Sequence, residues 1–257
     1  MPNPPIAAML LAAGRGERMR PLTDTCPKPL LRVRGKPLMQ WQLEALAQGG
    51  ISRVVVNTAW LGDQIEQVFG TRFAPALQIT YSHEGRDFGA ALETAGGIAR
   101  ALPLLCTTDR AGGDVFWLLA GDVFVPDFVF GLAAVERFIA SGKLAHLWLV
   151  ANPAHNPRGD FGLDLGAGSA STGLALNLSP NDPRPRYTYS TIGLYRQALF
   201  APPYCAIPSG NPQGMKAPLA SLLRAAMDNG QVSAELYAGA WTDVGTPARL
   251  QSLNCLK

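Results

Sequence analysis

The stretch that decides the fold reads Met9-Leu10-Leu11-Ala12-Ala13-Gly14-Arg15-Gly16-Glu17-Arg18-Met19-Arg20-Pro21, and Pro27-Lys28-Pro29 follows it. Its apolar start predicts a buried strand at Ile6–Leu11. The strand runs into small residues, whose backbone N–H groups can surround anionic oxygens. Three cations follow at once, Arg18, Arg20 and Lys28. The segment therefore indicates a polyphosphate-binding loop, and the alternative is a tight turn with a solvated basic rim.

Two common glycine-rich loops do not fit this segment. A P-loop needs a Gly-Lys-Ser/Thr ending, and none follows Gly14 or Gly16. A dinucleotide-binding fingerprint needs a third glycine three residues after the second, where this chain has Met19. The loop is therefore of another kind.

The run LAAGRGERMRPLT…PKPL, from Leu11 to Leu30, resembles the signature of the sugar-1-phosphate nucleotidylyltransferases. The resemblance extends over nearly the whole chain. It implies an α/β fold: a Rossmann-like, three-layer αβα nucleotidyltransferase architecture, GT-A-like, with a mixed, mainly parallel central sheet. It also implies a Mg²⁺-dependent enzyme that joins a nucleoside triphosphate to a sugar 1-phosphate and releases pyrophosphate.

Length and composition are compatible with this family. The chain has 257 residues, of which 47% are hydrophobic and 16% charged, as in a compact soluble protein. We expect one domain over residues 1–257, with a nucleotide-binding half at about 1–150 and a sugar-phosphate-binding half at about 151–257. The net charge of +3 is too small to indicate nucleic acid or a membrane as partner. The four cysteines form no CxxC pair, which suits a reducing compartment, and no secretory signal is visible. We therefore expect a cytoplasmic protein; its oligomeric state is not predicted.

Apolar runs alternate with helical patterns, which predicts an α/β fold. The strands expected after the first are Arg53–Asn57, Leu77–Ser82, Val115–Ala120, Ala145–Val150, Phe161–Leu165, Leu174–Leu178, Tyr187–Tyr195 and Val232–Tyr237. The helices are expected to begin at Pro37 and Thr246 and to cover Asp63–Phe69, Thr94–Leu104, Pro126–Ala140 and Ala217–Asn229.

For the nucleotide, the resemblance implies contacts from Ala13, Gly14, Gly16 and Glu17, with Arg18 and Lys28 as catalytic cations. Because the phosphate nucleophile is already an anion, the reaction needs no general base, only positioning and charge neutralisation. Arg18 suits the β/γ oxygens of the leaving group, and Lys28 suits the α-phosphate or the incoming phosphate. Glu17 either orients Arg18 or contacts the nucleoside.

Two aspartates are candidate ligands for Mg²⁺. Asp122 follows the apolar run Val115–Ala120, so it lies where ligands bind in open α/β sheets, although a turn-capping role is the alternative. Asp243 lies in Trp241-Thr242-Asp243-Val244-Gly245-Thr246, just before the last helix, where Thr246 is a candidate helix cap. The resemblance implies that both aspartates hold the metal, whose shell phosphate oxygens and waters complete.

The segment Leu92-Glu93-Thr94-Ala95-Gly96-Gly97 resembles the family's L-E-T-x-G-G loop. Gly96 permits close approach of the nucleotide, and Glu93 can accept hydrogen bonds from sugar hydroxyls. The alternative is a plain helix start, with Thr94 as cap and Glu93 exposed.

The run Asn152–Phe161 is the most informative for the acceptor sugar. It resembles the N-P-x-x-x-x-x-G-D-F run of the family's muramate-type members, in which this region faces the sugar phosphate. This similarity implies substrate contacts from Asn156, Gly159 and Asp160. Arg158 is a candidate for the phosphate or the lactyl carboxylate, or else a solvated turn residue.

Within the family, these segments favour UTP and N-acetylmuramate 1-phosphate as substrates, in peptidoglycan recycling. One alternative is a mannose-1-phosphate guanylyltransferase or another hexose-1-phosphate enzyme. Another is a non-catalytic nucleotide-sugar sensor. Two departures from the family pattern stand out: Ala120 where asparagine is common, and Thr191 where glycine is usual.

Overall fold

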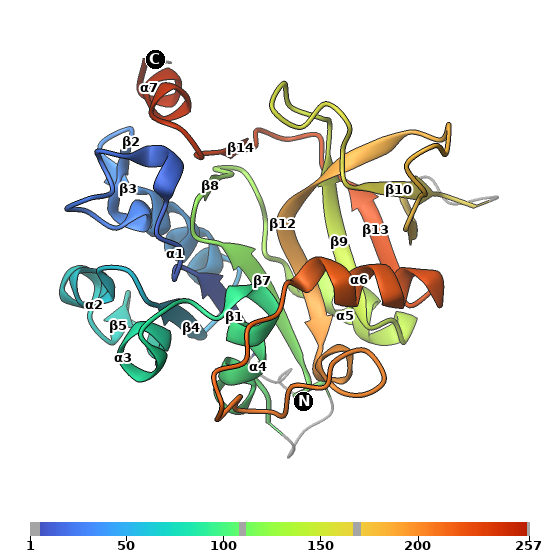
Figure 1. Cartoon of the computed structure of the whole chain (residues 1–257), viewed down its shortest axis with the longest axis horizontal. Helices are drawn as coiled ribbons and strands as arrows, with labels where there is room; N and C mark the ends of the chain where they lie inside the picture. Colours follow the sequence, from blue (N-terminus) through green and yellow to red (C-terminus); the bar gives the residue numbers. More distant parts are fainter. Residues whose placement is uncertain (1–5, 108–111, 167–170, 256–257) are drawn as a thin grey trace.

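A ten-stranded sheet forms the centre of the molecule (Figure 1). The computed structural model describes residues 6–107, 112–166 and 171–255. The sheet order is β10-β11-β13-β9-β12-β7-β1-β4-β6-β5. In that order the strands are Phe161–Asp164, Thr172–Leu176, Val232–Leu236, Ala145–Val150, Arg186–Arg196, Val115–Ala120, Ala7–Leu11, Arg53–Thr58, Leu77–His83 and Arg72–Phe73.

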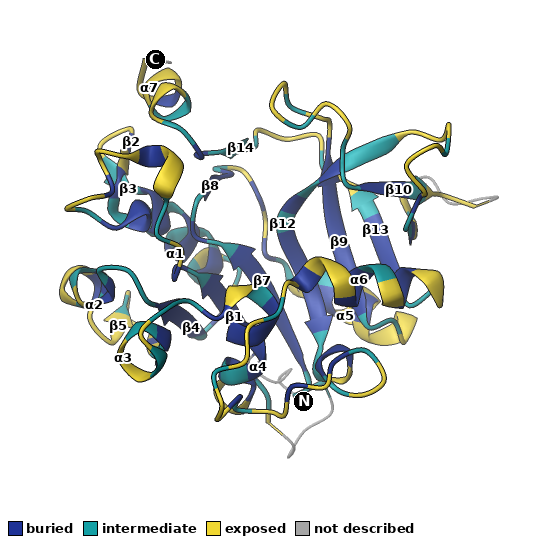
Figure 2. Ribbon diagram, viewed as in Figure 1, coloured by how far each residue is buried: buried dark blue, intermediate teal, exposed yellow. Residues whose placement is uncertain are grey.

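Helices cover both faces of the sheet, which confirms the three-layer arrangement. The first face packs against α4 (Glu93–Leu105) and α6 (Leu219–Asp228). The second packs against α1 (Leu38–Gln48), α2 (Gly62–Phe69) and α5 (Leu132–Ser141). Successive strand residues alternate between the two cores: Ala7 and Met9 belong to the first, Ala8 and Leu10 to the second. Because both faces are covered, the central strands are almost continuously apolar. Figure 2 shows most of their residues in dark blue, as buried.

The sheet is mixed, as predicted, but its parallel pairings are unevenly distributed. Neighbouring strands β7, β1, β4 and β6 are all parallel. Beyond them, among the described strands, only β13 and β9 pair in parallel, whereas β12 runs antiparallel to both β7 and β9. The expectation of a mainly parallel sheet therefore holds for the first half of the chain. Antiparallel pairing dominates the second, where β10 pairs with both β11 and β12.

The predicted elements all form, with one large error at a boundary. Helix α5 begins at Leu132, not at Pro126. Residues 126–131 are irregular because Phe128 and Phe130 leave the helical path to pack edge-on against Trp117. Among the described residues, no helix is long and apolar enough to cross a membrane.

The remaining elements are short, and several surround the carboxyl ends of β1 and β7. They are η1 (Glu17–Met19), η2 (Lys28–Leu30), β2 (Arg32–Val33), β3 (Lys36–Pro37), α3 (Glu84–Phe88), β8 (Val123–Phe124), η3 (Gln197–Phe200), β14 (Thr242–Asp243) and α7 (Pro247–Cys255). The Thr246 hydroxyl accepts a hydrogen bond from the Arg249 N–H at 3.4 Å, which agrees with its expected role as a helix cap.

Candidate active site

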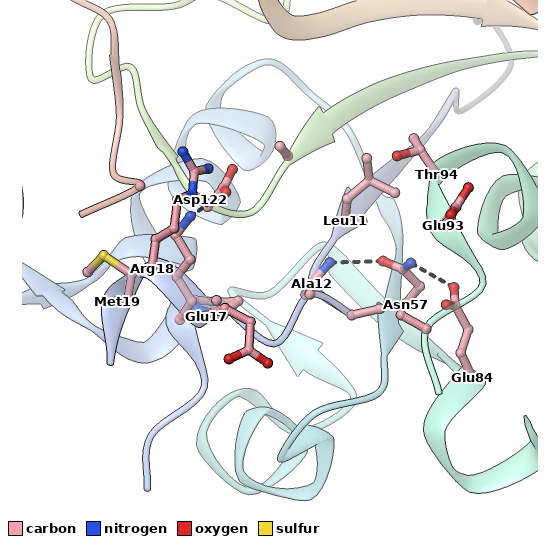
Figure 3. A pocket seen from close by; sticks show the side chains of 18 residues that line it. Leu11, Ala12, Glu17, Arg18, Met19, Asn57, Glu84, Glu93, Thr94 and Asp122 are labelled. Carbon is pink, nitrogen blue, oxygen red and sulfur yellow. Dashed lines mark hydrogen bonds and ion pairs between the residues drawn. The ribbon is translucent and has the colours of Figure 1, made fainter. Parts of the chain in front are cut away.

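A cavity of about 410 Å³ opens where β1 and β7 end. Figure 3 shows Arg18 and Asp122 on one side of it and Glu93 and Thr94 on the other. Eight residues predicted for the site line this cavity: Ala13, Gly14, Gly16, Glu17, Arg18, Lys28, Glu93 and Asp122. The chain thus brings together residues more than 100 positions apart. Five predicted residues do not line it: Gly96, Asn156, Gly159, Asp160 and Asp243.

The two glycines of the predicted polyphosphate-binding loop, residues 12–20, called the phosphate loop below, differ in what they do. Gly16 has a left-handed backbone (φ +69°), and a Cβ there would lie 3.1 Å from Thr23 Cγ2, so the turn itself requires glycine. The Thr23 hydroxyl donates to the Gly16 carbonyl at 2.9 Å, which holds that turn. Nothing lies within 4 Å of a Cβ on Gly14. Packing therefore does not require glycine at position 14, which suits close approach of a ligand.

The cations of the loop are held differently. Lys28 is buried, and its Nζ lies 2.5 Å from Asp122 Oδ2. The Arg18 side chain is exposed and has no carboxylate partner among the described residues. Glu17 pairs with Arg15 at 2.7 Å rather than orienting Arg18. Of these two cations, Arg18 is thus free to meet an anion, and Lys28 is fixed beside Asp122.

A buried glutamine that the sequence analysis missed holds the turn that carries Asp122. Gln42 in α1 is 2% exposed, and its Nε2 donates to the Ala120 and Val123 carbonyls at 2.6 and 3.1 Å. These carbonyls flank Gly121-Asp122. Gly121 N donates to the Leu11 carbonyl at 2.8 Å, and a Cβ on Gly121 would lie only 2.9 Å from that oxygen. The Asp122 backbone is therefore fixed against both β1 and α1.

Asp243 is brought next to Asp122 by strand pairing. In the β8–β14 ribbon Asp243 pairs with Val123, and Val244 N donates to the Asp122 carbonyl at 2.9 Å. The Asp243 carboxylate accepts from Arg249 at 2.8 Å and lies 3.3 Å from His155 Nε2. Each aspartate thus contacts a basic side chain.

The donor chemistry of this pair fits Mg²⁺. One carboxylate lies in β14 and the other in the turn just before its partner strand β8. Carboxylates are hard oxygen ligands, which Mg²⁺ prefers, and the ion normally takes only one or two of them besides phosphates and waters. The described residues hold no group of three or more histidines, cysteines, aspartates or glutamates that could form an all-protein metal cage. Two protein carboxylates, with substrate oxygens and waters to complete the coordination shell of the metal, agree with this donor set.

A small apolar cluster ties the loop to both aspartates. It contains Met19, Phe124 and Val244, and all three are at most 3% exposed. Each of these side chains follows a charged residue of the site by one or two positions. Packing at native density resists small shifts, so the cluster fixes the relative positions of the charged groups.

A second network that sequence reasoning missed spans the floor of the cavity. The Ala12 N–H donates to Asn57 Oδ1 at 2.9 Å, and Asn57 Nδ2 donates to Glu84 Oε1 at 2.7 Å (Figure 3). Glu84 Oε2 accepts from the Leu92 N–H at 2.7 Å. Glu84 is fully buried, and this burial raises the pKa of its carboxyl, while the bonds from Asn57 and Leu92 act in the opposite direction. The phosphate loop and the Leu92–Gly97 segment are thus joined through two side chains.

The Glu93–Gly97 segment meets two different neighbours. Glu93 lines the cavity with a left-handed backbone (φ +59°), a strained conformation often found at functional sites. Gly96 does not line the cavity. It lies instead against residue 215, since a Cβ on Gly96 would lie 2.4 Å from the Met215 carbonyl. Close packing of α4 on residues 215–217 thus explains this glycine, and its contact with a nucleotide stays a prediction.

The predicted acceptor residues lie on the loop before β10. Asn156 Nδ2 donates to Asp160 Oδ1 at 3.2 Å and to Thr188 Oγ1 at 3.1 Å. Asp160 Oδ2 accepts from the Tyr189 N–H at 2.8 Å. Gly159 has φ +62°, and a Cβ would lie 2.7 Å from Asn152 Oδ1. These groups hold the loop on β12; their contact with substrate remains a prediction.

Known proteins are similar to this chain in sequence and in fold. The nucleotidyl transferase family matches residues 7–256. N-acetylmuramate alpha-1-phosphate uridylyltransferase of Neisseria meningitidis serogroup B is 43% identical over 97% of each chain. A glucose-1-phosphate thymidylyltransferase of Streptomyces griseus is 28% identical over 97% of this chain and 65% of its own.

One solved structure shows the fold independently. A crystal structure from Bacillus anthracis, titled as a putative glucose-1-phosphate thymidylyltransferase, superimposes with a TM-score of 0.75 over 98% of this chain and 94% of its own, at 21% identity. Taken with the match to nearly the whole sequence, this likeness leads to one assignment: the chain belongs to the nucleotidyl transferase family.

Proposed function

We propose that this protein is a sugar-1-phosphate uridylyltransferase that makes UDP-N-acetylmuramate and pyrophosphate from UTP and N-acetylmuramate 1-phosphate. The observation that carries the chemistry is one cavity that joins a small-residue loop, the exposed Arg18, the buried Lys28 and the Asp122 carboxylate. The N. meningitidis relative, 43% identical over 97% of each chain, supports the choice of substrates.

In the proposed reaction, an oxygen of the sugar 1-phosphate attacks the α-phosphorus of UTP. The bond from the α-phosphorus to the bridging oxygen breaks, and pyrophosphate leaves with that electron pair. Arg18 stabilises the leaving β- and γ-phosphates. Lys28 offsets the repulsion between the α-phosphate and the incoming phosphate. Neither the attack of the phosphate oxygen nor the departure of pyrophosphate needs a proton acceptor. Positioning and charge neutralisation therefore supply the catalysis.

The family typically uses Mg²⁺, and Asp122 and Asp243 are the residues that would hold it here. The metal would supply positive charge to the phosphate oxygens. The described contacts of the two aspartates are with basic side chains, namely Lys28 for Asp122 and Arg249 with His155 for Asp243.

An assay of pyrophosphate release tests the proposal. It combines UTP, GTP, dTTP or ATP with the 1-phosphate of N-acetylmuramate, N-acetylglucosamine, glucose or mannose. We expect the highest kcat/KM with UTP and N-acetylmuramate 1-phosphate. Turnover only with GTP and mannose 1-phosphate would remove the muramate assignment. Nucleotide binding without turnover of any pair would favour a sensor instead of an enzyme.

A further inference from the structure

A second cavity, of about 740 Å³, lies beside the β10–β11 edge of the sheet, near the start of β12. The loop before β10, the loop after β11, the first residue of β12 and one turn of α6 form its walls. Three of its lining residues are arginines: Arg158, Arg186 and Arg224. Among the described lining residues, Asp160 is the one acidic side chain. The phosphoryl-transfer step proposed above uses none of the three arginines of this arginine cavity.

The three guanidinium groups are not neutralised by ion pairs. Arg186 donates to the Ser179 carbonyl, and Arg224 donates to Asn177 Oδ1 at 2.7 Å while lying over the Phe161 ring. Neither they nor Arg158 has a carboxylate within ion-pair distance among the described residues.

Other arginines of the second half behave differently: Arg184, Arg196 and Arg249 each pair with an aspartate at 2.7 or 2.8 Å. Asp160 already accepts hydrogen bonds at both carboxylate oxygens, from Asn156 and from Tyr189 N. The cavity therefore carries excess positive charge on donors suited to the planar, two-pronged recognition of an anion.

The same loop connects this cavity to the candidate metal site. His155 Nε2 lies 3.3 Å from Asp243 Oδ2, and Arg158 follows three residues later. Even an extended chain spans at most about 11 Å over three residues, and the turn from Asn156 to Gly159 shortens the path. Asn152 and Asn156 of this loop form hydrogen bonds with Arg186 and Thr188 of β12. These bonds fix the His155 end of the loop relative to the Arg158 end.

We propose that the arginine cavity binds the carboxylate of an acidic acceptor sugar while its 1-phosphate lies at the Lys28 side of the catalytic cavity. The enzyme then selects a carboxylate-bearing acceptor over its neutral analogue. This inference rests on the proposed function, and it assigns the selection to Arg158, Arg186 and Arg224.

The test compares two acceptors with saturating UTP, by kcat/KM for pyrophosphate release. N-acetylmuramate 1-phosphate carries the lactyl carboxylate, whereas N-acetylglucosamine 1-phosphate has a hydroxyl at that position. We expect Arg158→Ala to lower the ratio of the two kcat/KM values about tenfold, the effect of losing one charge-assisted hydrogen bond, mainly through the KM of the muramate substrate. Arg224→Lys keeps the charge but loses the planar fork, so it should lower the ratio as well.

Arg184→Ala is the matched control, because Arg184 is an exposed neighbour already paired with Asp182 and does not line the cavity. It should keep the wild-type ratio. If wild type prefers the muramate substrate and both cavity variants keep that preference, the cavity assignment is overturned while the proposed function stands. If wild type shows no preference for the carboxylate-bearing acceptor, both are overturned.

Discussion

Lys28 and Asp122 form a close ion pair at the carboxyl end of β7, and Asp243 holds Arg249 in the same way on the neighbouring ribbon. Separating a partly buried charge pair costs free energy unless another ion takes its place. In the proposed reaction a divalent cation and phosphate groups would supply such replacements together, since the metal would pair with the carboxylates and the phosphates with Lys28. Under the proposed function we therefore expect metal and nucleotide to bind together more favourably than either one alone.

The first prediction concerns the two carboxylates. Asp122→Asn and Asp243→Asn should each lower kcat by at least about 100-fold at fixed Mg²⁺, because each removes a charge that stabilises the cation at the reacting phosphates. A Mg²⁺ titration of pyrophosphate release measures the effect. Asp182→Asn is the control, since Asp182 pairs with Arg184 away from the cavity. Full activity in both variants would contradict the proposed metal site.

Thr191 shows how a single residue can strain a strand. The family resemblance already marks it as a departure, because glycine is usual there. In the structure Thr191 has φ +65°, within the irregular stretch of β12 between Tyr189 and Gly193, and its hydroxyl is buried without a hydrogen-bond partner among the described residues. A left-handed backbone is costly for a β-branched residue and easy for glycine. The left-handed backbone at position 191 thus explains why glycine is usual there in the family.

At the scale of elements, Asn57 and Glu84 join β4, α3 and the start of α4 to the phosphate loop after β1. Gly97 belongs to the same network, because a Cβ there would lie 2.4 Å from Glu84 Oε1. Neither Asn57 nor Glu84 carries the proposed chemistry. Their role is to hold the Ala12 N–H and the Leu92 N–H in a fixed relation across the cavity.

A swap of the two side chains tests this role. Asn57→Asp places two oxygens face to face, and Glu84→Gln turns an N–H₂ toward a donor, so each single change should destabilise the protein by about 1–3 kcal/mol and raise the KM for UTP. In the double variant the new carboxylate at position 57 can accept from both Ala12 N and the new amide at position 84, while the oxygen of that amide accepts from Leu92 N. Thermal unfolding and UTP kinetics of the four proteins measure the coupling.

Rescue in the double variant is the expected result, since the swap restores every hydrogen bond and keeps the net charge. If the losses of stability in the two single variants simply add in the double variant, the two side chains act independently. An unchanged KM for UTP in destabilised single variants would leave the network with a role in stability and none in positioning.

The same elements show what the sequence can and cannot predict. Local patterns place the strands well, since continuous apolar runs reflect the two cores on either side of β1 and β7. They fail for residues 126–131, where Phe128 and Phe130 instead pack edge-on against Trp117. Motifs identified most of the charged residues that line the cavity. Asn57 and Gln42 were missed because their partners lie 45 and 78 residues away, a relation that no local pattern carries.

At the scale of the whole molecule, the four cysteines divide by their surroundings. Burial raises the pKa of the Cys26 thiol and raises that of Cys106 to about 12, and Cys205 is buried. Cys255 is exposed. Because the thiolate is the reactive form, we expect one rapidly reacting thiol at a pH of about 7.5 in a DTNB assay of the folded protein.

Cys255→Ser should remove the rapid phase and leave the slow phases unchanged. A second rapid thiol in that variant would contradict the assignment. Denaturant should make all the remaining thiols fast, which controls for their presence in reduced form.

The place of β12 has a consequence for how the chain folds. This strand comes from the second half of the sequence, yet it lies between β7 and β9, which precede it along the chain. Until residues 186–196 have been made, a growing chain leaves one edge of β7 unpaired and β9 without the neighbour that joins it to β7. Such long-range pairing slows folding and prolongs the time for which unpaired edges are open. We therefore expect that residues 1–150 expressed alone do not form a stable fragment, because the sheet needs residues 186–196 to join β7 to β9.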